Sequence, residues 1–222
     1  MKRKIIIAVL SFILPMGLMA QGNWERPVTQ QNTQNKEVKE KPAKTKKAIA
    51  DEKYMVKNAV PEVDGKVEWV MDFDVPGSTA QSNYDKMLAF LNDFVKEKNQ
   101  LEESNVSIVN KQEYKIAASI REWLVFNSNF FSIDRTQFQY TLLVECFDNH
   151  VNVTMSRLKY FYDERPNKTT VFKAEELIID KEAMNKAKTK LVRPGAKFRR
   201  KTIDRKDEVF DKIKACLTGN NG

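Results

Sequence analysis

The sequence predicts an α+β domain in which helices pack on one face of an antiparallel β-sheet. Two observations support this fold class. Between residues 67 and 162, segments with alternating apolar and polar residues are interrupted by one segment with helical spacing. Helical patterns then occupy the C-terminal part, so the expected order is strand, helix, several antiparallel strands and helix. The folded domain is expected to span residues 54–217 as a single unit.

The first strand is expected at residues 67–75, because apolar side chains there occupy alternate positions, including Trp69, Met71 and Phe73. Pro76-Gly77 ends this strand. Ser78, with Gln81 three residues later, resembles the capping box that starts a helix. That helix is expected to continue to about residues 98–99. Its apolar residues at helical spacing are Tyr84, Met87, Leu88, Leu91, Phe94 and Val95.

Two further strands are expected over residues 106–109 and 114–126. In the second, alternate apolar side chains define one face, but Glu122 interrupts that face and leaves the register open. Residues 127–129 then break the pattern. The apolar positions on this face are Ile116, Ala118, Ile120, Leu124 and Phe126.

A hairpin around Asp148-Asn149 gives the clearest local prediction. If these two residues form the turn, one register pairs apolar residues with apolar ones and polar residues with polar ones. Beyond Arg157 the alternation changes phase, which indicates a bulge or the edge of the sheet. The expected pairs are Cys146 with Val151, Val144 with Val153, Leu142 with Met155, Glu145 with Asn152, and Thr141 with Ser156.

The C-terminal part is expected to contain two helices. The first covers about residues 175–190, and Pro194-Gly195 stops it. Asp204 is expected to cap the second helix, and Gly219 to close it. The apolar side of this second helix comprises Val209, Phe210, Ile213, Cys216 and Leu217.

Residues 1–20 have the pattern of a cleavable secretory signal peptide. A basic start precedes an apolar run from Ile5 to Leu14, and Ala20 is a small residue at the expected cleavage site. The run is shorter than the about 20 apolar residues of a spanning helix, and no Cys follows it for lipid attachment. We therefore expect an exported protein, periplasmic or secreted and not a lipoprotein, with no transmembrane segment after cleavage. Residues 21–53 predict a disordered polar linker, and residues 218–222 a loose tail.

The formal charge of +8 is unevenly distributed. Residues 181–214 carry 13 basic and five acidic residues, whereas residues 54–180 carry 14 basic and 20 acidic ones. Two interpretations of the basic region remain open, a contact surface for an anionic partner or a solvated face. Because export argues against nucleic acid, the expected partners are an envelope glycan, a lipid headgroup or a protein. The densest basic cluster comprises Lys197, Arg199, Arg200, Lys201, Arg205 and Lys206.

Few other residues suggest chemistry. Cys146 and Cys216 could form a disulfide if the last helix lies over the sheet, or remain buried thiols. His150 is the only histidine and lies beside the expected turn, where side chains usually face solvent. One His and two distant Cys do not predict a metal site of the usual kind, and no motif predicts a cofactor or a catalytic residue. The aromatic residues at 160–162 and 130–131 could line a ligand groove or pack in the core.

These features resemble a family of exported Bacteroidetes proteins, the domain of unknown function 4468, which has a TBP-like fold. The resemblance covers about residues 54–217. It rests on Gly65-Lys66 before the first strand, residues 75–78 leading into a helix, the 140–155 hairpin, and residues 198–204 leading into the last helix. The resemblance implies a layout of strand, helix, four-stranded antiparallel sheet and helix. It implies no activity.

The sequence therefore predicts a protein of unknown biochemical function. We expect a non-enzymatic periplasmic or surface module that binds an envelope component or a protein partner. Two alternatives stay open. One is an enzyme of unrecognised type, which would need a cleft with converging polar groups, and the other is a structural or stress-related envelope protein without a specific ligand.

Overall fold

The computed structural model describes residues 51–128, 132–165 and 168–219. The predicted signal peptide, residues 21–50 of the predicted linker and the last three residues lie outside these ranges. The described chain begins with the short helix α2 (Glu52–Met55), so helical structure starts slightly before the predicted domain boundary at Tyr54.

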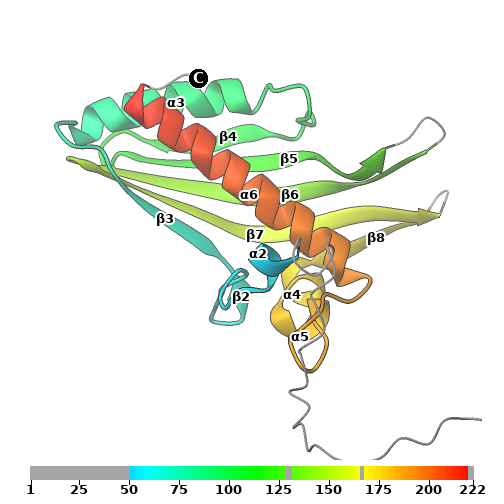
Figure 1. Ribbon diagram of the computed structural model, residues 1–222. Coiled ribbons are helices and arrows are strands. Elements are labelled where there is room, and N and C mark those ends of the chain that lie inside the picture. The colour runs from blue at the N-terminus through cyan, green and yellow to red at the C-terminus, as the bar shows by residue number, and fades with distance from the viewer. Residues whose placement is uncertain (1–50, 129–131, 166–167, 220–222) are drawn as a thin grey trace, which may run out of the picture. The chain divides into compact units, whose positions relative to one another are not determined.

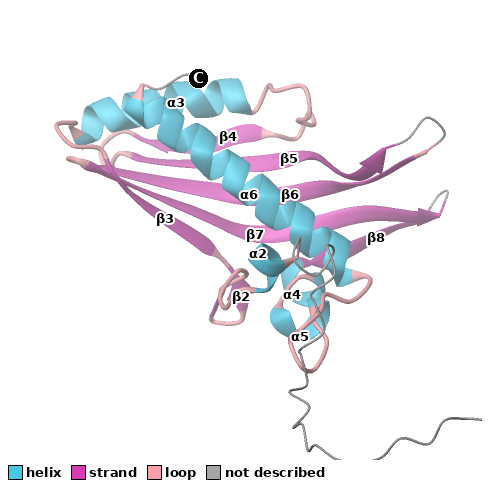
Figure 2. Ribbon diagram, in the orientation of Figure 1, coloured by secondary structure: helices cyan, strands magenta, loops and turns pink. Residues whose placement is uncertain are grey.

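An antiparallel sheet of six strands forms the centre of the fold (Figure 2). Its order is β3–β7–β6–β5–β4, and β8 pairs with the second half of β7 on the edge where β3 pairs with the first half. A two-stranded hairpin, β1 (Glu62–Val63) and β2 (Lys66–Val67), precedes the sheet. The strands are β3 (Trp69–Asp74), β4 (Asn105–Asn110), β5 (Lys115–Ser128), β6 (Ile133–Phe147), β7 (His150–Arg165) and β8 (Lys168–Lys173).

The sheet confirms the predicted α+β class and adds a strand that was not predicted. β8 shows little alternation in its sequence, and only Val171 and Phe172 are apolar within it. Pairing with the outer half of β7, rather than its own pattern, places it in the sheet. Asn127 and Ser128, which the sequence assigned to a break, are still part of β5.

The β6–β7 hairpin has the predicted register in full, from Cys146 opposite Val151 to Thr141 opposite Ser156. Its two-residue turn is completed by Asn149, which has a φ of 60°. The predicted change of phase is a bulge, where the pairing shifts between Gln139 and Thr141 and Arg157 has a φ of 58°. Beyond this bulge the even-numbered residues of β7 face the core.

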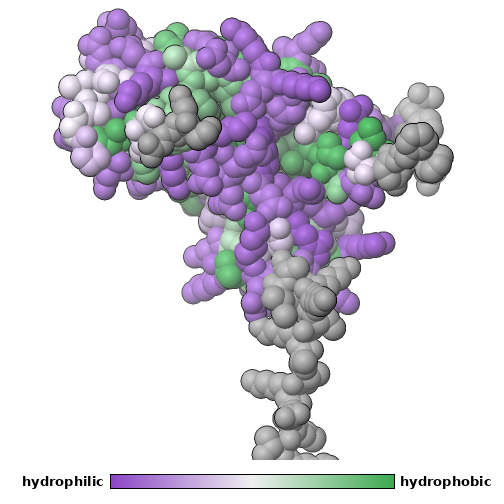
Figure 3. Space-filling model, turned by 45° about the horizontal axis from the view of Figure 1, so that its top comes forward, coloured by the Kyte–Doolittle hydropathy of each residue, from purple (hydrophilic) through white to green (hydrophobic). Residues whose placement is uncertain are grey.

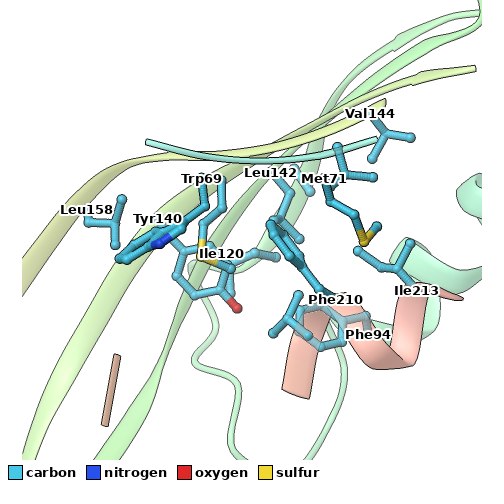
Figure 4. Close-up of a cluster of buried hydrophobic side chains, with 14 of the residues drawn as sticks. Trp69, Met71, Phe94, Ile120, Tyr140, Leu142, Val144, Leu158, Phe210 and Ile213 are labelled. Atoms are coloured by element: carbon cyan, nitrogen blue, oxygen red, sulfur yellow. The ribbon is translucent and has the colours of Figure 1, made fainter. Parts of the chain in front are cut away.

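Helices α3 (Ala80–Phe94) and α6 (Gly195–Thr218) cover the same face of the sheet, and α6 crosses the strands diagonally (Figure 1). The core lies between this face and the two helices. Figure 4 shows side chains from the sheet, including Met71, Tyr140 and Leu142, converging on Phe94 of α3 and Phe210 of α6. All five are buried. Burial of this apolar layer is the main stabilisation that the fold gains.

Helix α3 starts one residue later than the capping box suggested. Thr79 is the N-cap, and its hydroxyl accepts a hydrogen bond from the Ser82 amide at 3.1 Å. The Ser78 hydroxyl is already used, because it donates to the Val75 carbonyl and accepts from Asn83. The helix ends at Phe94, before the predicted limit at residues 98–99.

The helical prediction for residues 175–190 is wrong. Two short helices, α4 (Ala174–Leu177) and α5 (Asp180–Ala183), are followed by an irregular segment. The Asn185 side chain accepts hydrogen bonds from the backbone amides of Thr189 and Lys190, which closes a loop that a helix would not form.

The start of the last helix also differs from the prediction. Pro194 is the N-cap of α6, Gly195 is its first residue, and Asp204 lies well inside it. A side chain at Gly195 would meet the Leu177 carbonyl oxygen at 2.2 Å, so only glycine allows α6 to begin this close to α4. Gly219 closes the helix with a φ of 74°, as predicted. The helix therefore contains the whole predicted basic cluster.

Candidate functional site

Arg199 is the most deeply buried member of the basic cluster, with no exposed surface. Its guanidinium donates to the carbonyls of Tyr54 and Ile178, each at 2.6 Å, and to the Asp180 carboxylate at 2.8 Å. These bonds connect α6 to the segments that contain α2, α4 and α5. Burial opposes ionisation of Asp180, but the bonds from Arg199 and Lys188 outweigh it and lower the pKa of the carboxyl.

Arg205 forms a buried ion pair with Glu122, the residue that interrupted the apolar face of β5. The two guanidinium–carboxylate distances are 2.8 and 2.7 Å. Tyr140, Asn99 and Gln100 donate three more hydrogen bonds to the same carboxylate. Burial alone would lower the pKa of Arg205, but the bonds and charge of Glu122 raise it above its ordinary value. The pair is therefore charged and fully bonded inside the core.

Three of the remaining cluster members also pair within the chain. Lys197 contacts Asp134 at 2.8 Å and donates to the Tyr162 hydroxyl at 2.8 Å. Arg200 makes a bidentate pair with Asp51 at 2.6 and 2.7 Å, and Lys206 pairs with its neighbour Asp207. Lys201 is exposed. Five of the six cations of the predicted anionic-partner surface are therefore paired with carboxylates of the chain itself.

A large cavity lies where α6 begins, with a volume of about 1250 Å³. Its walls come from β6, β7 and β8, from α2 and α4, from the irregular segment before α6, and from the first turns of α6. Phe172, Leu177 and Leu191 supply apolar surface, and Tyr162 and Lys197 lie beside them. Seen from the helix side, the surface of the protein is mostly hydrophilic with smaller hydrophobic areas (Figure 3).

Two cations of this cavity have no ion pair within the described residues, Lys190 and Arg193. Both are exposed, and both belong to the segment that leads into α6. The cavity also contains the paired cations Lys197 and Arg200 with their partners Asp134 and Asp51, so its lining carries an excess of positive charge. The sequence prediction missed Lys190 and Arg193 because the segment was assigned to a helix and its end. Their basic character was visible, but their convergence on a cavity was not.

The other predicted site residues have separate positions. Cys146 is buried on β6 and Cys216 is half-buried on α6, and both are free thiols, so the disulfide allowed by the sequence is not formed in the structure. His150 lies between two carboxylates of β3, with Asp74 and Asp72 each at 3.2 Å. Residues 130–131 lie outside the described residues.

The aromatic run at 160–162 is divided between the two faces of the sheet. Tyr160 is buried and hydrogen-bonds to Thr202, Tyr162 borders the cavity, and Phe161 lies under the Arg121 guanidinium. The described part of the chain has no group of three or more His, Cys, Asp or Glu side chains arranged to hold a metal ion. None of the helices in that part has the length and apolar character needed to span a bilayer.

Comparison with known proteins identifies the family. A family described as a domain of unknown function (DUF4468) with TBP-like fold matches residues 69–161. A crystal structure of a DUF4468 family protein from Bacteroides ovatus is 39% identical, with a TM-score of 0.69, and the alignment covers 75% of this chain and 94% of that one. The chain belongs to the DUF4468 family.

A second solved structure supports the fold of this DUF4468 protein. A TBP-like protein from Parabacteroides distasonis is 22% identical, with a TM-score of 0.61, and the alignment covers 72% of this chain and 97% of that one. No curated protein matches the chain. The family match ends at residue 161, so most of the cavity lining, including Lys190 and Arg193, lies outside the matched segment.

Proposed function

We propose that this DUF4468 protein is an exported, non-enzymatic binding module that holds an anionic amphiphile of the cell envelope in the cavity beside α6. The observation that carries the proposal is the combination of unpaired cations with apolar walls in one cavity. Lys190 and Arg193 can bind a negatively charged head group. Phe172, Leu177 and Leu191 can bind an apolar chain.

The cavity has the size and composition for such a ligand. Its volume of about 1250 Å³ is that of a site for a single-chain lipid rather than for an ion. Lys197 adds a third polar group at the wall, but Asp134 and the Tyr162 hydroxyl already hold its ammonium group. We therefore assign the head group to Lys190 and Arg193, and a positioning role at the cavity wall to Lys197.

The predicted export of the protein makes the envelope the source of the ligand. The signal-peptide pattern of residues 1–20 supports this location, and the polar residues that follow it would let the domain stand away from a membrane surface. An anionic lipid with one acyl chain fits both the location and the cavity.

Calorimetric titration with lauroyl-lysophosphatidylglycerol below its micellar concentration tests this proposal. We expect saturable binding, and weaker binding of the zwitterionic lauroyl-lysophosphatidylcholine, which shares the acyl chain. Reversal of both charges in Lys190→Glu/Arg193→Glu should lower the affinity for the anionic lipid at least about tenfold, equivalent to about 1.4 kcal/mol of binding free energy.

The matched control is Lys181→Glu/Lys186→Glu, which makes the same charge change at exposed residues that do not line the cavity. This control should bind both lipids as the wild type does. Absence of saturable binding to either lipid, or an equal loss in both double variants, would overturn the proposal.

A further inference from the structure

We infer that the sheet face opposite α3 and α6, called here the open face, binds a second copy of this chain in an antiparallel, face-to-face dimer. No helix of the described residues packs on this face. In each strand, the residues that alternate with the core residues point toward the open face. Leu143 of β6 and Thr154 of β7 are two of these residues, and they lie opposite each other. The inference concerns a different surface from the cavity.

Exposed apolar side chains gather on the open face. Nine large hydrophobic residues are exposed among the described residues, and the strand registers place six of them on this face. Soluble proteins seldom expose several such residues on one surface unless that surface has a partner. The six residues are Val70, Ile108, Val125, Ile133, Phe147 and Val171.

One end of the open face is acidic. Asp72 and Asp74 of β3 are exposed there, next to the β6–β7 turn, and Glu145 of β6 lies two strands away in the same row as Asp72. Their counter-charges are Lys115, which pairs with Glu145, and His150, which lies between the two aspartates. Three carboxylates against one lysine and one histidine leave this end negative at neutral pH.

The other end of the open face, beyond the bulge, is basic and aromatic. Lys159 and Lys173 lie opposite each other on β7 and β8, and neither has an ion pair within the described residues. The Arg135 guanidinium covers the Trp123 ring at 3.6 Å, and Arg121 covers Phe161 at 4.2 Å. The acidic residues at this end are Asp163, which accepts from Thr169, and Glu103, which pairs with Arg121.

A two-fold axis across the strands brings these two ends together. If two open faces pack with their strands antiparallel, the acidic end of each copy contacts the basic end of the other. Five strands spaced at about 4.8 Å and about ten residues rising about 3.3 Å each give a face of roughly 24 by 33 Å. That area of roughly 800 Å² equals the surface that each partner buries in an interface of standard size.

Sedimentation velocity with two charge-reversed variants tests the dimer. Asp72→Lys/Asp74→Lys makes the acidic end positive, and Lys159→Glu/Lys173→Glu makes the basic end negative. The wild type should be a dimer in the micromolar range and should dissociate more readily at high salt. Each variant alone should be mainly monomeric, because like charges then face each other. An equal mixture of the two variants should form dimers again, since both contacts of the heterodimer are attractive.

The same measurement on Lys181→Glu/Lys186→Glu, which changes the charge equally away from the open face, should give the wild-type result. Unfolding by denaturant should show that the open-face variants remain folded. A wild type that stays monomeric would overturn the inference, as would variants that fail to associate when mixed. Protection of open-face amides by residues 21–50 in hydrogen exchange, in a monomeric chain, would assign the face to that segment and would also overturn it.

Discussion

The two faces of the sheet use positive charge in different ways. On the face covered by α3 and α6, Arg199 and Arg205 are buried and bonded to carboxylates and carbonyls of the same chain. On the open face, Lys159 and Lys173 are exposed and have no ion pair within the described residues. The densest basic cluster in the sequence therefore serves mainly to fix α6, whereas more dispersed lysines supply free charge.

This difference shows that local charge density is a poor guide to a binding surface. A guanidinium can be held inside a protein when its hydrogen bonds are satisfied by acceptors that lie far away in the sequence. Glu122 and Arg205 are 83 residues apart. The free cations of the open face, Lys159 and Lys173, lie 14 positions apart in the sequence, and the pairing of β7 with β8 brings them together.

Removal of the buried charge on the covered face should have the largest effect. In Arg205→Met, the Glu122 carboxylate keeps three neutral donors but loses its counter-charge, so the free energy of unfolding should fall by about 3–5 kcal/mol. Chemical denaturation of the variant measures this change.

A double-mutant cycle sharpens this result. If the two charges depend on each other, Glu122→Met/Arg205→Met should lose less stability than the sum of the two single variants. Additive losses would show that the residues contribute independently and would contradict the pairing described for the covered face.

The close approach of α6 to α4 predicts the next largest effect. The Cβ atom of Gly195→Ala would lie 2.2 Å from the Leu177 carbonyl oxygen, so the start of α6 must move. We expect a loss of about 1–3 kcal/mol of unfolding free energy. Gly77→Ala is the comparison, because its Cβ would meet no atom within 4 Å, although its φ of 79° also disfavours alanine. A smaller loss for Gly195→Ala than for Gly77→Ala would contradict the packing argument.

Acid should lower the unfolding free energy of the protein, because protonation of Asp180 removes its bonds to Arg199 and Lys188. Its pKa in the folded chain is lower than the ordinary value of 3.8, so its contribution is present above that value and is lost as the pH falls through the folded pKa. The carboxyl is partly exposed, so we expect a contribution of about 1 kcal/mol or less.

Unfolding free energies between about pH 6 and about pH 2.5 measure this contribution. Asp180→Asn should lose stability at the upper end of this range and change less with pH than the wild type. Asp211→Asn, at an exposed position on α6, should retain the wild-type dependence. Equal slopes for Asp180→Asn and the wild type would rule out the assigned role.

The cysteines give the smallest effect, one of reactivity rather than stability. Burial under the covered face raises the pKa of the Cys146 thiol to about 12, so iodoacetamide should not modify it in the folded protein. Cys216 is half-buried and should react first. Mass spectrometry of the unreduced, denatured protein should find two reactive thiols, and a protein with none would restore the disulfide interpretation.

Much of the sheet could be predicted because its strands have a period of two. In the β6–β7 hairpin, burial of one face fixes every pair from Cys146 to Thr141, so the register follows from the sequence alone. The first turns of α6 could not be predicted in this way. Arg199 and Arg205 are polar in the sequence but occupy its buried side, and their acceptors come from β5 and from the chain around α5.

The candidate cavity could not be predicted from local sequence patterns either, because its walls come from the loop closed by Asn185 and from residues of β6, β7 and β8. One signal was available. A single Glu on the apolar face of a strand requires a buried cation, and Glu122 could have pointed to an Arg on the inner side of α6.

The most direct test of the difference between the two faces is to reverse one cation on the covered face and two on the open face, and to measure the unfolding free energy and the sedimentation coefficient of both variants. Arg205→Glu should unfold at a much lower denaturant concentration than the wild type, because it places two carboxylates together in the core. Lys159→Glu/Lys173→Glu should keep the unfolding free energy of the wild type while its sedimentation coefficient falls toward that of a monomer. The opposite pattern, a stable Arg205→Glu protein together with an unfolded or still dimeric Lys159→Glu/Lys173→Glu protein, would contradict the roles assigned to the two faces.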